Sequence, residues 1–163
     1  MRAAVLTIST RVARSEAEDT SGLLLARLAE EAGCDVVGME VVPDDAELII
    51  DRMHHWVEDG ATFLLCTGGT GFTPDDYTPE SALEVIERRA TGIEHALHAE
   101  AQRRHPMGAL SRAVAGISGG TLIVTFPGSP RAIEELFGVV APLLEHAAAL
   151  LRGDRDAHGP RGG

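Results

Sequence analysis

Glycines, hydroxyls and acids are concentrated between residues 67 and 80, in the stretch TGGTGFTPDDYTPE. Glycines let backbone N–H groups approach a ligand closely, and the N–H groups at the start of a helix favour anions. Thr78-Pro79-Glu80 predicts such a start, because it combines a hydroxyl cap, proline at the first helical position and an acid in the first turn. Two adjacent aspartates suit an anion only if a divalent cation joins them. The stretch therefore predicts a site for a phosphate and a metal.

Other unusual segments follow the ends of neighbouring expected strands. They are the loop after Ser9, Pro43-Asp44-Asp45 and Pro127-Gly128-Ser129. In an open parallel sheet, ligands bind outside the carboxyl ends of the strands. We therefore expect these segments to converge and Asp44 to lie near Asp76. Asp44 can instead be a simple helix cap, and Asp76 a simple turn residue.

The remaining polar residues allow fewer interpretations. Arg112, beside Ser111, is by default a surface arginine, but in a region rich in glycine and hydroxyls it is also a natural phosphate clamp. His95 and His98 have the i, i+3 spacing of zinc ligands, yet no third ligand accompanies them. Solvated or interface histidines are the simpler interpretation. The Gly-x-Ser-x-Gly pattern at 116–120 falls at the turn of an expected hairpin rather than between a strand and a helix, so it is not a nucleophile elbow, which argues against hydrolase chemistry.

The composition limits the classes of protein and partner. The 163 residues suit one domain, and the net charge of −11 argues against a nucleic-acid surface. The chain contains no lysine, which excludes a P-loop lysine and Schiff-base chemistry. The sequence has no apolar run long enough to span a bilayer, and it enters a strand directly without a signal peptide. Together with the isolated Cys34 and Cys66, read as free thiols, this predicts a cytoplasmic protein that does not bind membranes.

Apolar runs and helical periodicity alternate along the chain, which predicts a mostly parallel sheet with helices on both faces. The expected fold class is α/β, a three-layer α/β/α arrangement with one antiparallel hairpin strand. Residues 1–152 would form a single domain, and residues 153–163 a disordered polar tail. The expected strands cover 2–9, 36–42, 61–66 and 121–126, the last in a hairpin with 109–117. The expected helices cover 20–32, 44–59, 79–90, 93–103 and 130–152, and 10–19 is expected to be a loop.

Ordered motifs over residues 3 to 150 resemble the MogA/MoaB family of molybdenum cofactor biosynthesis proteins, which is related to the G domains of gephyrin and of its plant counterpart. The resemblance rests on Thr67-Gly68-Gly69-Thr70-Gly71, on Asp76-x-Thr78-Pro79-Glu80, and on SRAVAG at 111–116. It also includes TLIV at 121–124 and PGSP at 127–130.

The resemblance implies a homotrimeric molybdopterin-binding protein. Adenylyltransferases of this family transfer AMP from ATP to the terminal phosphate of molybdopterin with magnesium, release pyrophosphate, and supply a downstream metal-insertion enzyme. The family's essential aspartates map to Asp44 and Asp76, with Asp76 the expected metal ligand. The phosphate-binding loop maps to Thr67–Gly71, and the substrate pocket to Ser111 and Pro127-Gly128-Ser129.

One departure keeps a second hypothesis open. Many of the adenylyltransferases have Arg-Asp where this chain has Asp75-Asp76, so a positive charge is missing beside the expected phosphate. The alternative is a MoaB-like protein that binds or carries the pterin and has little or no catalytic activity. An unrelated nucleotide-binding module that uses the same loop is a third interpretation.

Overall fold

A six-stranded sheet with the order β2-β1-β3-β6-β5-β4 forms the middle layer of the computed structural model, which describes residues 1–154. Its parallel part consists of β2 (Asp35–Val42), β1 (Arg2–Ile8), β3 (Phe63–Thr67) and β6 (Thr121–Phe126). Strand β5 (Ala115–Ser118) pairs antiparallel with β6, and β4 (Arg88–Arg89) pairs antiparallel with β5. This arrangement confirms the predicted mostly parallel sheet and its hairpin.

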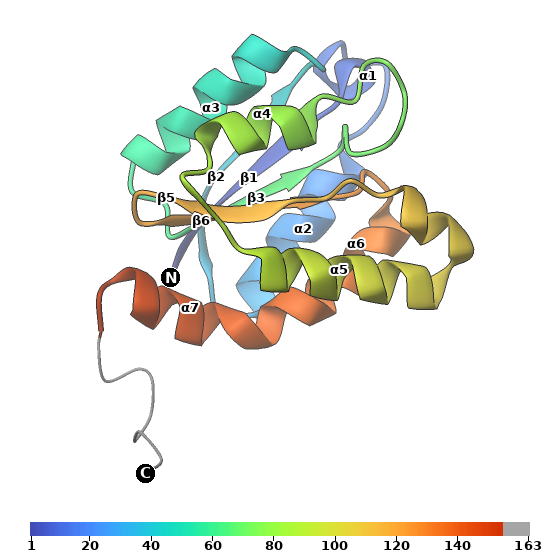
Figure 1. Cartoon of the computed structure of the whole chain (residues 1–163). Helices are drawn as coiled ribbons and strands as arrows, with labels where there is room; N and C mark the ends of the chain where they lie inside the picture. Colours follow the sequence, from blue (N-terminus) through green and yellow to red (C-terminus); the bar gives the residue numbers. More distant parts are fainter. Residues whose placement is uncertain (155–163) are drawn as a thin grey trace.

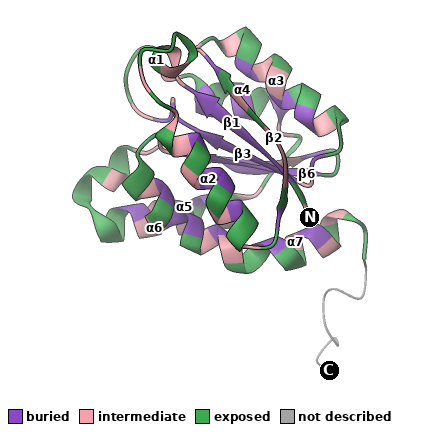
Figure 2. Cartoon of the chain, turned by 180° about the vertical axis from the view of Figure 1, so that it is seen from behind, coloured by how far each residue is buried: buried purple, intermediate pink, exposed green. Residues whose placement is uncertain are grey.

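Helices cover both faces of the sheet (Figure 1). One layer contains α2 (Thr20–Glu31), α5 (Thr91–Arg104), α6 (Pro130–Val140) and α7 (Leu144–Leu151). The other contains α3 (Ala46–Glu58) and α4 (Thr78–Val85). Figure 2 shows the strands as a mostly buried layer between helices that are exposed on their outer sides. The continuous apolar runs of the sequence are explained by this double cover, because β3 and β6 are buried along their whole length.

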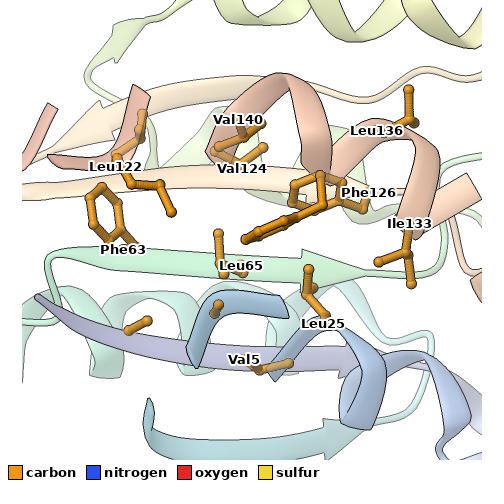
Figure 3. Packing of buried hydrophobic residues seen from close by; sticks show 14 of the residues in the cluster. Val5, Leu25, Phe63, Leu65, Leu122, Val124, Phe126, Ile133, Leu136 and Val140 are labelled. Carbon is orange, nitrogen blue, oxygen red and sulfur yellow. The ribbon is translucent and has the colours of Figure 1, made fainter. Parts of the chain in front are cut away.

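Large apolar side chains fill the space between the sheet and the α2–α6 layer (Figure 3). Phe63 and Leu65 project from β3 toward this layer, and Phe126 projects from β6. The ring of Phe126 lies 6.2 Å from that of Phe137, measured between centroids. This packing fixes the ends of β3 and β6, from which the two glycine turns begin.

The helix expected to end near residue 90 was wrong at its C-terminal end. The helix expected over 79–90 ends at Val85, and Arg88 and Arg89 form the edge strand β4. Glu94 is buried yet accepts hydrogen bonds from the Arg89 guanidinium and from the Ala115 N–H. The backbone N–H groups of Glu87 and Ala90 donate to the carbonyls of β5 instead of to a preceding helical turn, so the α4 helix does not continue.

Other element boundaries also bear on the expected fold. The hairpin begins at Ala115 rather than at 109, because the 3₁₀ helix η1 (Pro106–Leu110) occupies the preceding residues. The segment expected to be a loop at 10–19 contains the short helix α1 (Thr10–Ala13), capped by the Ser9 hydroxyl. The last helix, expected over 130–152 with a restart at Pro142, is divided there by the 3₁₀ helix η2 (Ala141–Leu143), as the proline predicted. Most of the predicted tail, 155–163, lies outside the described residues.

Two findings bear on the predicted cellular context. None of the described helices is long and apolar enough to cross a membrane. Both cysteines are free and buried, and burial raises the pKa of the Cys66 thiol well above its usual range. Cys66 is thus a core residue rather than a reactive one.

Ser81 in the first turns of α4 allows a test of the packing. Its hydroxyl oxygen is buried and has no hydrogen-bond partner among the described residues. An unpaired buried polar group is unfavourable, and alanine is the better helix former, so Ser81→Ala is expected to stabilise the fold by about 1 kcal/mol. Urea unfolding followed by circular dichroism measures this difference. A loss of stability would show that the hydroxyl has a partner.

Candidate active site

The glycine loop begins where β3 ends, and its backbone is tightly enclosed. Gly68 has φ +97°, and its N–H donates a hydrogen bond of 3.1 Å to the Phe126 carbonyl. A Cβ atom on Gly68 would come within 2.1 Å of the Ile8 carbonyl oxygen. Only glycine satisfies both the dihedral angle and this contact. The ends of β1, β3 and β6 therefore meet at Gly68, as the sequence predicted for a shared edge of the sheet.

Gly69 joins the same loop to α4. It has φ +60°, its carbonyl accepts a hydrogen bond of 3.1 Å from the Thr78 N–H, and a Cβ would lie 2.3 Å from the Thr78 hydroxyl oxygen. The prediction that the Thr78 hydroxyl caps α4 was wrong. Thr78 is the first helical residue, and Tyr77 occupies the capping position without a side-chain hydrogen bond. Pro79 is therefore the second helical residue rather than the first.

Asp76 closes the turn that follows the glycines. Its Oδ2 accepts hydrogen bonds from the Thr73 N–H at 2.8 Å and from the Thr73 hydroxyl at 2.6 Å. Its Oδ1 has no protein partner among residues 1–154. Asp76 is therefore a turn residue and also a carboxylate with one oxygen available, so the two interpretations of this residue are compatible.

Arg112 holds both ends of this turn. Its Nε donates to the Gly71 carbonyl at 2.8 Å, and its Nη2 donates to the Asp76 carbonyl at 2.6 Å. Its Nη1 forms an ion pair with Glu80. The Arg112 side chain lines neither of the cavities described below. Arg112 thus supports the loop through its hydrogen bonds. The sequence had suggested instead that it contacts a phosphate directly.

Asp44 lies on the other side of the loop and is held by Thr10. Its Oδ2 accepts hydrogen bonds of 2.8 Å from both the N–H and the hydroxyl of Thr10. The N-cap of α3 is Asp45, whose side chain accepts from the Leu48 N–H, so the interpretation of Asp44 as the helix cap was wrong. The Oδ1 of Asp44 faces Gly69, at 3.4 Å from the position that a Cβ there would take.

Two cavities meet at the glycine loop. The larger, about 570 Å³, is lined on one side by Gly69, Thr70, Gly71 and Asp76 and on the other by the turn 127–129 and the start of α6. The smaller, about 350 Å³, is bounded by Asp44 and by the start of α2. Gly69 and Gly128 line both cavities. Figure 1 shows the loop after β3 beside α1, at the carboxyl edge of the sheet.

The predicted site residues divide between these cavities. The sequence predicted that Asp44 and Asp76 lie near each other, and the structure places them along one loop, Asp44 on the smaller cavity and Asp76 on the larger. Apart from Arg112, every predicted residue lines at least one cavity. The larger one includes Gly69, Thr70, Gly71, Asp76, Ser111, Pro127, Gly128 and Ser129, and the smaller one includes Asp44, Thr67, Gly68, Gly69 and Gly128.

Three residues of the site were missed by reasoning from residue types. Asp19 caps α2 and accepts a hydrogen bond of 2.8 Å from the Thr7 hydroxyl, and Ser21 donates one of 2.7 Å to the Gly128 carbonyl. Arg131 reaches the larger cavity from the first turn of α6. The Asp-x-Ser-Gly element at 19–22 is one of the ordered motifs that resemble the family, but it was given no role in the site. Arg131 gave none beyond its place after the second glycine turn.

Ser129 lies at the start of α6, and His98 lies on α5. Ser129 occupies the N-cap position of α6, but its hydroxyl makes no capping hydrogen bond and is left free beside the larger cavity. The Nε2 atom of His98 lies 2.9 Å from the Ala113 carbonyl oxygen. Residues 1–154 contain no group of three or more His, Cys, Asp or Glu side chains that could hold a metal ion. The zinc interpretation therefore has no support in this part of the chain.

The sequence profile of a family described as "Probable molybdopterin binding domain" matches residues 4–146. The chain is 36% identical over 147 residues to molybdenum cofactor biosynthesis protein B of Escherichia coli, covering 88% of this chain and 85% of that protein. It is 28% identical over 153 residues to the molybdopterin adenylyltransferase of Helicobacter pylori, covering 92% and 87%. It is also 40% identical over 157 residues to Dictyostelium discoideum gephyrin, covering 90% of this chain but only 22% of gephyrin.

Solved structures agree with these sequence relations. The crystal structure of the molybdopterin biosynthesis enzyme MoaB from Thermus thermophilus superposes with a TM-score of 0.87 at 37% identity, covering 93% of this chain and 96% of that one. A structure of MogA gives a TM-score of 0.88 at 32% identity, covering 93% and 99%. The six-stranded sheet, the glycine loop and the family match point the same way. The chain belongs to the molybdopterin-binding domain family of the molybdenum cofactor biosynthesis proteins.

Proposed function

We propose that the protein transfers AMP from ATP to the terminal phosphate of molybdopterin. The observation that carries the proposal is the pair of cavities sharing Gly69 and Gly128, because a reaction between two bound substrates requires two adjoining sites with one common wall. In the reaction, an oxygen of the pterin phosphate attacks the α-phosphorus of ATP. The bond from that phosphorus to the bridging oxygen of the β-phosphate breaks, and pyrophosphate leaves.

The chemistry asks for placement and charge compensation rather than for a strong base, because the attacking phosphate is already ionised. The glycines, which adopt positive φ without a steric penalty, give the loop an open backbone that can approach phosphate oxygens. The Oδ1 atoms of Asp44 and Asp76 are hard oxygen ligands that fit a magnesium ion arriving with the nucleotide. When bound, such an ion would supply positive charge that offsets the negative charge of the phosphates.

The absence of a complete metal cage among residues 1–154 is compatible with this assignment. Magnesium usually retains several waters and takes one or two carboxylates together with substrate phosphates. Asp76 is the ligand that we propose first, since its turn is held at both ends by Arg112 and the carboxylate is therefore well positioned. The similarity to the Helicobacter pylori adenylyltransferase, which extends over most of the chain, supports this activity.

Asp75 favours a second candidate, a MoaB-like protein that binds the pterin without efficient AMP transfer. Asp75 is exposed and occupies the position where many related adenylyltransferases have arginine, so a guanidinium that could contact a phosphate is missing there. Incubation with molybdopterin, ATP and magnesium decides between the two. Adenylylated pterin and stoichiometric pyrophosphate are expected. Pterin binding without either product at saturating substrate would favour the second candidate and reject the first.

We also propose that the protein acts in the cytoplasm as a homotrimer that passes its product to a metal-insertion enzyme. Gephyrin supports a link to a later step of cofactor synthesis, because this chain matches only 22% of gephyrin and the remainder is available for other functions. Multi-angle light scattering is expected to give a mass near three times 17.2 kDa. A monomeric mass at micromolar concentration would contradict the trimer.

A further inference from the structure

The two cavities contain very little positive charge. The smaller is lined by three acids, Glu18, Asp19 and Asp44, and by no basic residue. Among residues 1–154, the basic side chains on the larger are His105 and Arg131. The Nδ1 atom of His105 accepts a hydrogen bond of 3.1 Å from the Met107 N–H at the start of η1. Because a guanidinium is always charged, Arg131 is the permanently cationic side chain that residues 1–154 contribute to these linings.

Both substrates of the proposed reaction carry phosphates, and the chain has a net charge of −11. The bound phosphates need a local cation in addition to any metal. Arg112 cannot supply it, because its three guanidinium nitrogens are directed at Gly71, Asp76 and Glu80. The charge deficit in the cavities thus points to Arg131.

The present contacts of Arg131 leave it available. Its Nε donates to Glu135 one turn later at 3.1 Å, and 77% of its side chain is exposed. An exposed i, i+4 ion pair is weak, whereas a guanidinium can bind phosphate through two charge-assisted hydrogen bonds. Glu135 also lines the larger cavity. A phosphate that enters the larger cavity therefore competes with Glu135 for Arg131, and the existing ion pair is weak.

We propose that Arg131 binds a substrate phosphate in the larger cavity, and that Glu135 holds the arginine until the substrate arrives. The identity of the phosphate rests on the proposed function, since ATP and molybdopterin both carry one. The pairing assigns opposite effects to the two residues. Loss of Arg131 should weaken binding, and loss of the Glu135 charge should strengthen it.

The test is calorimetric titration of ATP with magnesium and, separately, of molybdopterin into the full chain and its variants. Arg131→Ala is expected to raise Kd by about tenfold for the substrate whose phosphate it holds. Arg131→Lys should recover part of the loss, because lysine keeps the charge but not the paired geometry. Glu135→Gln should lower the same Kd by about two- to threefold. Both effects should shrink at high salt.

Arg27→Ala is the matched control, because Arg27 and Glu31 form another exposed i, i+4 pair on α2, and neither residue lines the two cavities. It should leave both Kd values unchanged. Values within twofold of wild type for Arg131→Ala with both substrates would overturn the proposal, as would a wild type that binds neither. A wild type that binds ATP but makes no product rejects AMP transfer alone, and the effects of Arg131 and Glu135 on binding would still stand.

Discussion

Asp76→Asn is expected to lower the rate of AMP transfer by about 10²-fold or more, while the protein remains folded. Asparagine keeps an oxygen that can accept from the N–H and hydroxyl of Thr73, so the turn is preserved. What is lost is the negative charge at the free Oδ1, which we expect to hold magnesium beside the phosphates. The change therefore separates the structural role of Asp76 from its electrostatic role. Pyrophosphate release, measured against magnesium concentration, should show a lower maximum and a higher half-saturation.

Asp75→Asn is the control for this change. It removes the same charge from the adjacent residue, whose exposed side chain makes no hydrogen bond or ion pair with residues 1–154. It should leave the rate within about twofold of wild type, since a solvated charge is strongly screened. Equal losses in the two variants would show that net charge, rather than the position of Asp76, controls the reaction.

The sequence was sufficient for the parts of the fold that depend on continuous apolar runs. Strands β1, β3 and β6 are covered on both faces, and their runs of apolar residues required no knowledge of their partners. The edge strand β4 gave no such signal. It is two residues long, consists of two arginines, and is held by the buried Glu94, which is twenty-one positions from its Ala115 partner.

The same distinction applies to the site. The role of Gly68 and Gly69 could be predicted from the sequence, because glycine is the residue type that tolerates positive φ and close packing of the backbone. The roles of Asp44 and Arg112 could not, because they depend on which atoms happen to face them after folding. Asp44 accepts a hydrogen bond from Thr10, and Asp45 caps the helix. Arg112 donates a hydrogen bond to a carbonyl of the loop. Residue type gave the chemistry of these side chains but not their partners.

Gly68→Ala is expected to destabilise the protein by roughly 3 kcal/mol, which lowers Tm by about 10 °C for a domain of this size. The new Cβ would meet the Ile8 carbonyl oxygen at 2.1 Å, and that oxygen belongs to the backbone at the end of β1, so no side-chain rotation can relieve the contact. The φ of +97° adds strain of its own. Because the loop can move only by separating the ends of β1 and β3, both cavities should distort, and AMP transfer should fall below detection.

Gly138→Ala shows whether this loss is specific to the loop. Gly138 lies within α6 and a Cβ there would have no heavy atom within 4 Å, so alanine should stabilise the helix by about 0.5–1 kcal/mol. Thermal unfolding should therefore move in opposite directions for the two substitutions. Wild-type Tm and activity for Gly68→Ala would mean that the ends of the three strands do not lock the loop. In that case the common wall between the two cavities would be adjustable, and the argument that it fixes two substrates relative to each other would fail.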